Sequence, residues 1–184
     1  MPRFDHVILT AANEAQARGY RAQLAWRRQR GAGDPRTRFH VVADPGGRRV
    51  GSLGATLHAL AELIPTLRKE APDAPSIEAL FAGRRILLCH SGGDSRRLPA
   101  YAAQGKVFTP LPTTHRGIPA ALFDLILANV EALPTNPAGQ VLIYVGDVLL
   151  TFDPDAVRFD APGVVGVAYP GSIETAARHG VYVA

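Results

Sequence analysis

Apolar positions are distributed along the chain in two patterns. Short apolar runs rich in Val, Ile, Leu and Phe are typical of strands buried in a sheet. These runs predict strands near residues 4–9, 39–43, 85–90, 140–146 and 163–168. The segments between most of them mix apolar and polar residues over ten or more positions, which favours helices packed on that sheet.

Boundary signals place the helices. Asn13 and Gln16 form a capping-box pattern, and Pro119 suits the first turn of a helix. Helices are predicted over residues 14–28, 55–68 and 120–133, with short helices capped by Ser76 and Ser172 that end at Phe81 and His179. The prolines between Thr109 and Pro119 predict an extended connector. Strands that alternate with helices predict an α/β fold: a mainly parallel sheet with helices on both faces.

Length and charge narrow the classes of function. A chain of 184 residues that is 47% hydrophobic can bury one core, so we expect a single domain over residues 1–184. The net charge of +4 fits an anionic ligand and is modest for a nucleic-acid binder. The basic stretch 27–38 has no interleaved aromatic residues that could stack on bases. We therefore expect a solvated helix end and loop there and no nucleic-acid partner.

The chain also lacks signs of a membrane or redox role. It has no run of about 18 apolar residues, and Asp5 and Asn13 interrupt the opening segment where a signal peptide would be apolar. Cys89 is the single cysteine and lies in an apolar run, which favours a buried hydrophobic role over a nucleophilic one. We expect a soluble cytoplasmic protein with no membrane partner.

Candidate chemistry begins after the run 85–90, where the sequence continues SGGDSRRLP. Gly92 and Gly93 lack a β-carbon, so the backbone there can take positive φ and turn successive N–H groups toward one anion. Arg96, Arg97 and Lys106 add positive charge after the turn. These features together suit a polyphosphate ligand, although an ordinary glycine turn followed by exposed arginines gives the same pattern.

Two further segments carry alternatives that the residues alone leave open. The glycine-rich stretch 44–56 lies between a strand and a helix start, and it can be a phosphate site or an ordinary connection. Asp147 interrupts the apolar run 140–150, whose composition is typical of a strand covered on both faces. Its carboxylate can bind a metal ion, or it can be a turn aspartate that accepts hydrogen bonds.

The pattern Gly-Gly-x-Ser-x-Arg-Leu-Pro with a later lysine resembles the signature of sugar-1-phosphate nucleotidyltransferases. Within that superfamily the chain most resembles the L-fucose-1-phosphate guanylyltransferase family, also called GDP-L-fucose pyrophosphorylase, including the amino-terminal half of bifunctional fucokinase enzymes. Three more stretches carry the likeness, which covers most of the chain: FDHVILTAANEAQARGY, VVADPGGRRVGSLGATLHAL and FTPLP. Leu53 departs from the family, which usually has a small residue at that position.

The resemblance implies a Rossmann-like nucleotidyltransferase sheet that transfers a nucleotidyl group, GMP from GTP, to L-fucose 1-phosphate and releases pyrophosphate. It implies catalytic roles for Arg97 and Lys106, a Mg²⁺ ligand at Asp147, and nucleotide-binding roles for Gly92, Gly93, Ser95, Gly51, Ser52, Gly54 and Thr56.

In the resembled family the domain continues beyond the equivalent of residue 184, where Val181 to Ala184 would begin a further strand. We therefore expect a chain truncated at its C-terminus. A kinase domain or the missing C-terminal part on a separate chain is then a possible partner, and a non-catalytic nucleotide-binding module is the alternative function.

Overall fold

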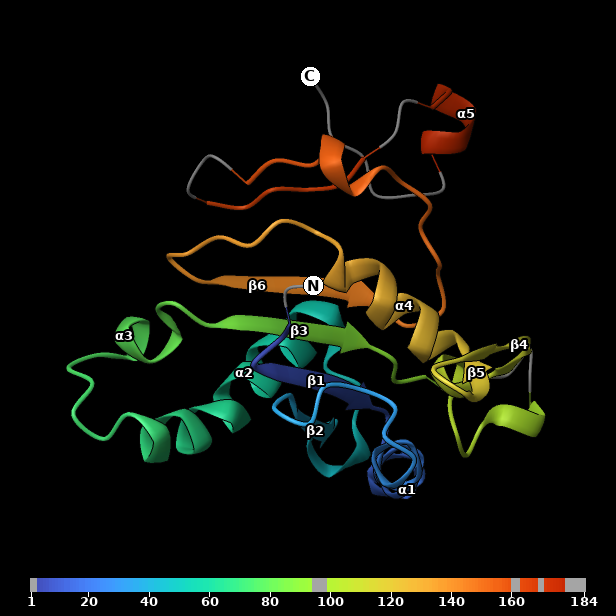
Figure 1. Ribbon diagram of the computed structural model, residues 1–184, viewed down its shortest axis with the longest axis horizontal. Helices are drawn as coiled ribbons and strands as arrows, with labels where there is room; N and C mark the ends of the chain where they lie inside the picture. Colours follow the sequence, from blue (N-terminus) through green and yellow to red (C-terminus); the bar gives the residue numbers. More distant parts are fainter. Residues whose placement is uncertain (1–2, 94–98, 160–162, 169–170, 178–184) are drawn as a thin grey trace.

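A four-stranded parallel sheet forms the centre of the protein (Figure 1). The computed structural model describes residues 3–93, 99–159, 163–168 and 171–177. The strands are β1 (His6–Ala11), β2 (Arg38–Ala43), β3 (Arg85–His90) and β6 (Gln140–Val145), in the order β2-β1-β3-β6. All three strand pairs are parallel and in unbroken register. The carboxyl ends of the strands therefore lie at one edge of the sheet, called here the carboxyl edge.

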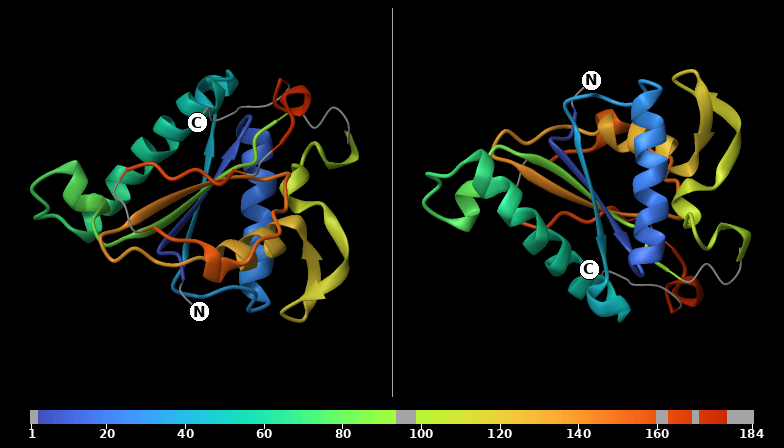
Figure 2. Two further views of the ribbon diagram at one scale, coloured as in Figure 1. Left: turned by 90° about the horizontal axis from the view of Figure 1, so that it is seen from above. Right: turned by 90° about the horizontal axis from the view of Figure 1, so that it is seen from below.

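Helices cover both faces of this sheet, as the sequence predicts (Figure 2). On one face α1 (Glu14–Gln29) and α4 (Leu122–Glu131) pack against odd-numbered strand residues such as Leu9 and Leu87. On the other, α2 (Gly51–Glu70) and α3 (Ile77–Phe81) pack against even-numbered residues such as Ile8. Successive side chains of a strand point to opposite faces, so each strand contributes to two apolar layers.

The predicted helix starts are confirmed at α1 and α3. The Asn13 side chain accepts a hydrogen bond from the Gln16 N–H at 3.0 Å, and the Ser76 hydroxyl accepts one from the Ala79 N–H at 3.2 Å. Helix α2 begins at Gly51, four residues before the predicted start at residue 55. Gly51 has φ of +73°, a conformation that a residue with a β-carbon disfavours, and it turns the chain into the helix.

The proline-containing connector is a β-hairpin, which the sequence did not predict. Strands β4 (Pro110–His115) and β5 (Ile118–Ala121) pair antiparallel beside α4. Arg116 and Gly117 both have positive φ, as in the two-residue turns that match the twist of a hairpin. The expected first-turn role of Pro119 is wrong, because Pro119 lies in β5. A two-stranded ribbon tolerates proline because each strand has a free edge.

The C-terminal predictions fail in part. Residues 163–168 form no strand, and their apolar side chains are exposed. Helix α5 (Ile173–Ala176) is shorter than predicted, and His179 and the strand expected from Val181 lie outside the described residues. Strand β6 is an edge strand whose α2-side residues Val141, Ile143 and Val145 are exposed, so it is not covered on both faces.

Short 3-10 turns complete the described structure: η1 (Pro45–Gly47), η2 (Pro99–Tyr101), η3 (Lys106–Phe108) and η4 (Pro154–Ala156). In the part of the chain that the structure describes, no helix has the length and apolar character needed to cross a membrane.

Candidate functional site

The predicted phosphate-binding loop and the Gly146-Asp147 pair meet at the carboxyl edge. Residues 91–93, called here the Gly92 turn, continue directly from β3, and the Gly146 N–H after β6 donates to the His90 carbonyl at 2.8 Å. The Lys106 Nζ lies 2.8 Å from Asp147 Oδ2, although 41 residues separate them in the sequence. The structure thus brings Gly92, Lys106 and Asp147 to the same edge of the sheet.

The structure gives a reason for Gly92 other than the predicted positive φ. Neither has φ in the left-handed region. A β-carbon on Gly92 would lie 3.0 Å from the Ala12 nitrogen and 3.1 Å from the Ala11 carbonyl carbon. The glycine is therefore required by close backbone packing against the end of β1. Ser95 and the two arginines, Arg96 and Arg97, lie outside the described residues.

Lys106 and Asp147 form a partly exposed ion pair, with side-chain exposures of 34% and 50%. Asp147 has a side-chain partner here, in place of the backbone donors expected of a turn aspartate. Among the described residues no group of three His, Cys, Asp or Glu side chains could hold a metal ion. Mg²⁺ commonly takes one or two carboxylates and completes its octahedral shell with phosphate oxygens and water. A single carboxylate such as that of Asp147 fits such a shared site.

The start of α2 presents the second predicted loop. Gly51, Ser52 and Leu53 are exposed, and the residue that precedes the helix, Val50, makes no side-chain cap. Val50 therefore leaves the first N–H groups of α2 without a side-chain cap. Free N–H groups at the start of a helix favour the binding of an anion. The side chain of Leu53 is 73% exposed, so it does not occupy the interior of this turn.

Thr56 points inward and connects the two loops. Its hydroxyl donates to the Ser52 carbonyl at 3.0 Å and lies 2.9 Å from His90 Nε2, so the histidine supplies the second hydrogen. Burial lowers the pKa of His90, although the nearby Asp44 raises it. Burial also raises the pKa of Asp44. The Thr56 side chain joins β3 to α2, while Gly54 beside it is partly exposed.

The sequence analysis missed the residues of α1 that contact the Gly92 turn and the segment before Lys106. The Tyr20 hydroxyl donates to the Ser91 carbonyl at 2.7 Å, and burial raises the pKa of that hydroxyl well above its usual range. A β-carbon on Gly19 would lie 2.4 Å from the Ala103 carbonyl oxygen. An isolated glycine inside a helical pattern signals close packing, and Gly19 was the available clue.

Two other predictions concern single residues. Cys89 is fully buried, and burial raises the pKa of its thiol to about 12, which confirms a hydrophobic rather than a nucleophilic role. Residues 27–38 are a helix end and loop as predicted, but Arg27 is not solvated, because it is buried and makes two hydrogen bonds to Asp124, at 2.8 and 3.0 Å. Arg27 also lines a cavity of about 170 Å³ that lies between α1 and α4, apart from the carboxyl edge.

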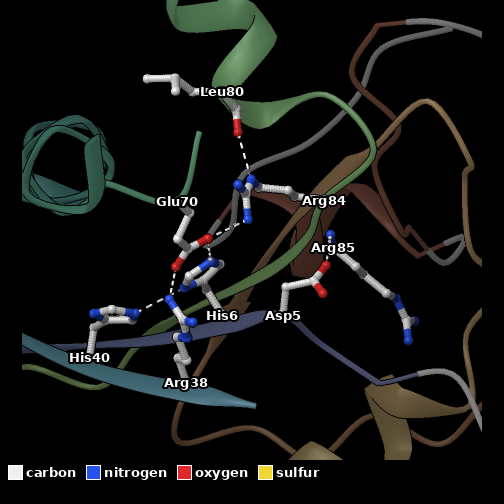
Figure 3. Close-up of polar contacts among 8 residues, drawn as sticks. All are labelled: Asp5, His6, Arg38, His40, Glu70, Leu80, Arg84 and Arg85. Atoms are coloured by element: carbon white, nitrogen blue, oxygen red, sulfur yellow. Dashed lines mark hydrogen bonds and ion pairs between the residues drawn. The ribbon is translucent and has the colours of Figure 1, made fainter. Parts of the chain in front are cut away.

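A second polar cluster occupies the opposite, amino edge of the sheet (Figure 3). Glu70 at the end of α2 binds Arg38 and Arg84 and lies 3.5 Å from His6 Nε2. The His6 Nδ1 is 3.0 Å from His40 Nε2. Burial, followed by Arg84 and Arg38, lowers the pKa of His6 to about 4. This cluster holds the end of α2 against the sheet.

The chain is similar to known proteins along its whole length. Residues 79–184, more than half of the chain, match the family described as "Fucose pyrophosphorylase domain". The chain is 34% identical to human "Fucose-1-phosphate guanylyltransferase" over 188 residues, which cover 98% of this chain and 28% of that protein. The mouse protein of the same name is 33% identical over 184 residues, 98% of this chain and 29% of that protein.

A plant relative has two named activities. The Arabidopsis thaliana "Bifunctional fucokinase/GDP-fucose pyrophosphorylase" is 33% identical over 199 residues, which cover 100% of this chain and 19% of that protein. No solved structure matches the chain. The chain spans less than a third of the length of each of these relatives. Because the family match covers more than half of its residues, the chain belongs to the fucose pyrophosphorylase family.

Proposed function

We propose that the carboxyl edge is a nucleotidyl-transfer site that joins a nucleoside triphosphate to a sugar 1-phosphate. The observation that carries this proposal is the pairing of Lys106 with Asp147 beside the Gly92 turn. The start of α2 lies at the same edge of the sheet. A cation, a carboxylate and uncapped N–H groups are the donors and acceptors that a metal-bound polyphosphate needs. Ligands of open α/β sheets bind at this edge.

In the proposed reaction an oxygen of the sugar 1-phosphate attacks the α-phosphorus of the nucleotide. The bond from that phosphorus to the oxygen that bridges to the β-phosphate breaks, and pyrophosphate leaves with the bonding electrons. The protein positions two anions and offsets the developing negative charge. In this mechanism Lys106 offsets charge on the phosphates, and the backbone of Gly92 and Gly93 cradles them. Arg97 and Ser95 would act from residues outside the described part of the chain.

Asp147 is the residue that would hold Mg²⁺. When bound, the ion would supply positive charge that offsets the negative charge of the phosphates. Lys106 would then leave the Asp147 carboxylate and turn to the phosphates. The nucleotide-binding roles of Gly51, Ser52 and Gly54 follow from the exposed start of α2, whereas Thr56 would act by holding that start against His90.

The identities of the substrates rest on the names of the relatives. Fucose-1-phosphate guanylyltransferase and GDP-fucose pyrophosphorylase imply GTP and L-fucose 1-phosphate. The bifunctional relative suggests a fucokinase domain as a further partner, supplied with the rest of the enzyme on the same or a separate chain. The cytoplasmic location stays a prediction.

The test is release of pyrophosphate by the purified chain with GTP, Mg²⁺ and L-fucose 1-phosphate. Activity with this set above that with ATP or UTP, and above that with other sugar 1-phosphates, would support the proposal. Tight binding of GTP without product would instead favour the alternative, a nucleotide-binding module. Binding of neither substrate would overturn both.

Lys106→Ala gives a sharper form of this test. The ammonium meets charge that builds in the transition state, so kcat should fall about a hundredfold while the affinity for Mg²⁺-bound GTP falls much less. Lys69→Ala is the matched control, because Lys69 is exposed near the far end of α2. Equal losses in kcat and affinity would contradict the role assigned to Lys106.

A further inference from the structure

Gln16 is a nearly buried polar residue in the first turn of α1, with 4% of its surface exposed. Its side chain makes three hydrogen bonds to backbone groups. The Ala12 N–H donates to Gln16 Oε1 at 2.8 Å, and Gln16 Nε2 donates to the carbonyls of Gly93 and Ala102, each at 3.1 Å. These partners come from three separate segments of the chain.

The carboxamide is the side-chain group that fits these partners. It offers one acceptor oxygen to an N–H group and two N–H donors to two carbonyls. A carboxylate of the same shape accepts only, and it would face two carbonyl oxygens. The three bonds fix the Gly92 turn and the segment that leads to Lys106 relative to the end of β1, on either side of residues 94–98.

Neighbouring positions of α1 support the same contact. Gly19 leaves room for the Ala103 carbonyl, and the Tyr20 hydroxyl holds the Ser91 carbonyl. Gly105 has φ of +65°, and a β-carbon there would lie 2.0 Å from the Tyr20 hydroxyl oxygen. Positions 16, 19 and 20 lie on one face of a helix, so α1 presents a continuous platform to the loop.

We propose that Gln16 is a positioning residue: it holds Gly93 and Ala102 at a fixed separation and so sets the affinity of the carboxyl edge for polyphosphate anions. The inference rests on the proposed function, because it takes this edge to be the phosphate site. Gln16 itself touches no reacting atom. It acts through the backbone of the loop, whose N–H groups and following lysine meet the ligand.

The test compares Gln16→Glu and Gln16→Leu with wild type. Dissociation constants are measured for GTP with Mg²⁺ and for inorganic tripolyphosphate, and amide hydrogen exchange is followed in the peptide that spans residues 91–105. Gln29→Glu is the matched control, since Gln29 is exposed at the end of the same helix and receives the same new charge. Melting curves confirm that each variant is folded.

Gln16→Glu should weaken binding of both probes about ten- to a hundredfold and speed exchange in residues 91–105, because the partly buried carbonyls of Gly93 and Ala102 lose their donor. Burial raises the pKa of a carboxyl group, so the new glutamic acid should protonate as the pH falls from about 8 to about 6. The protonated acid can donate one hydrogen bond. The ratio of variant to wild-type dissociation constants should therefore shrink over that range.

Gln16→Leu should weaken binding without this pH dependence, because it cannot regain a donor. Unchanged affinity and exchange in folded Gln16→Glu or Gln16→Leu would overturn the positioning role while leaving the proposed function intact. Wild-type protein that binds neither GTP nor tripolyphosphate would overturn the proposed function, and with it any role of Gln16 in affinity. Equal weakening by Gln29→Glu would show a general charge effect and also overturn the inference.

Discussion

At the scale of single residues, the pairing of Lys106 with Asp147 makes the two charges mutually dependent. Each offsets the other at 2.8 Å, so neither presents its full charge to an incoming ligand. A phosphate that binds without a metal must compete with Asp147 for the lysine. A phosphate that brings Mg²⁺ supplies each side chain with a new partner. The pair therefore favours the metal-bound form of a nucleotide.

Asp147→Asn tests this dependence. The amide keeps the shape but removes the negative charge, so affinity for GTP in the presence of EDTA should rise several-fold, while the gain from Mg²⁺ should disappear. The melting temperature should change little, because a half-exposed ion pair contributes only about 0–1 kcal/mol. Titration calorimetry with and without Mg²⁺ measures both effects.

Asp155→Asn is the control for Asp147→Asn, because it makes the same charge change at an exposed position outside the site. Retention of the full Mg²⁺ gain in Asp147→Asn would exclude this carboxylate as the metal ligand. Stability lost by roughly 1–3 kcal/mol would instead indicate a structural aspartate whose hydrogen bonds the amide cannot replace.

At the scale of elements, helix α2 contains a local conflict between sequence and structure. Pro65 lies inside the helix and is exposed. Proline has no N–H to donate to the preceding turn, and its ring crowds the carbonyl four residues before it. The helix forms nevertheless, because Ala59, Leu63 and Leu67 bury one face against the sheet. Tertiary packing here outweighs local propensity.

Pro65→Ala should raise the free energy of unfolding by about 1–3 kcal/mol, since it restores a hydrogen bond and leaves no cavity at an exposed position. The greater chain entropy of the unfolded variant offsets part of that gain. Urea denaturation measures the change, with Glu62→Ala on the same helix as the control. Unchanged or lower stability would mean that Pro65 does not destabilise α2 in its packed position.

The sequence predicted best those strands whose residues are nearly all buried, because burial on both faces gives a continuous apolar run. Strand β3 is buried except at His90, and its apolar run predicts both of its ends; β1 is buried throughout, but the run at residues 4–9 places it two residues too early. The hairpin after Lys106 escaped prediction because its prolines oppose strand formation in general, though not at a ribbon edge. The apolar residues 163–168 satisfy a strand pattern, but a pattern cannot supply the pairing partner that a strand requires.

The candidate site was predictable in its chemistry but not in its supports. Gly92, Lys106 and Asp147 stand out by residue type and position, and the parallel sheet brings them to one edge. The reason for Gly92 is a close approach to Ala11 and Ala12, which depends on β1 and β3 being neighbours. Gln16 matched a capping pattern, which concealed its second role beneath the loop. Long-range contacts of this kind leave no local signal.

At the scale of the whole molecule, the two edges of the sheet differ in how their charged side chains are used. The carboxyl edge exposes charge to a ligand, whereas the amino edge holds the histidine cluster of Figure 3 against Glu70, Arg38 and Arg84. Burial lowers the pKa of both His6 and His40 to about 4; Arg84 and Arg38 also lower the pKa of His6, and His6 and Arg38 also lower that of His40. Neutral histidines are therefore part of the folded state.

This arrangement predicts a loss of stability in mild acid. Above pH 6.5 both histidines are neutral in the folded and unfolded chain, so the folded state has its full stability. As the pH falls from about 6.5 toward 4, His6 and His40 become protonated in the unfolded chain but stay neutral in the folded chain. The free energy of unfolding should therefore decrease by roughly 1–3 kcal/mol per histidine. Below pH 4 this contribution levels off.

Buried carboxyl groups act in the opposite direction and must be separated from the histidines. Burial raises the pKa of Glu131 and of Asp44, so the folded chain takes up protons first at those groups and gains stability as the pH falls. Comparison with His40→Gln isolates the contribution of His40 to the pH dependence of stability, because glutamine can still hydrogen-bond to His6 but does not titrate. Denaturation by urea at pH 7.5, 6.5, 5.5 and 4.5 should give a shallower decline for this variant than for wild type. Parallel declines in the two proteins would show that His40 binds protons equally in the folded and unfolded chain, and would contradict its contribution to the loss of stability in acid.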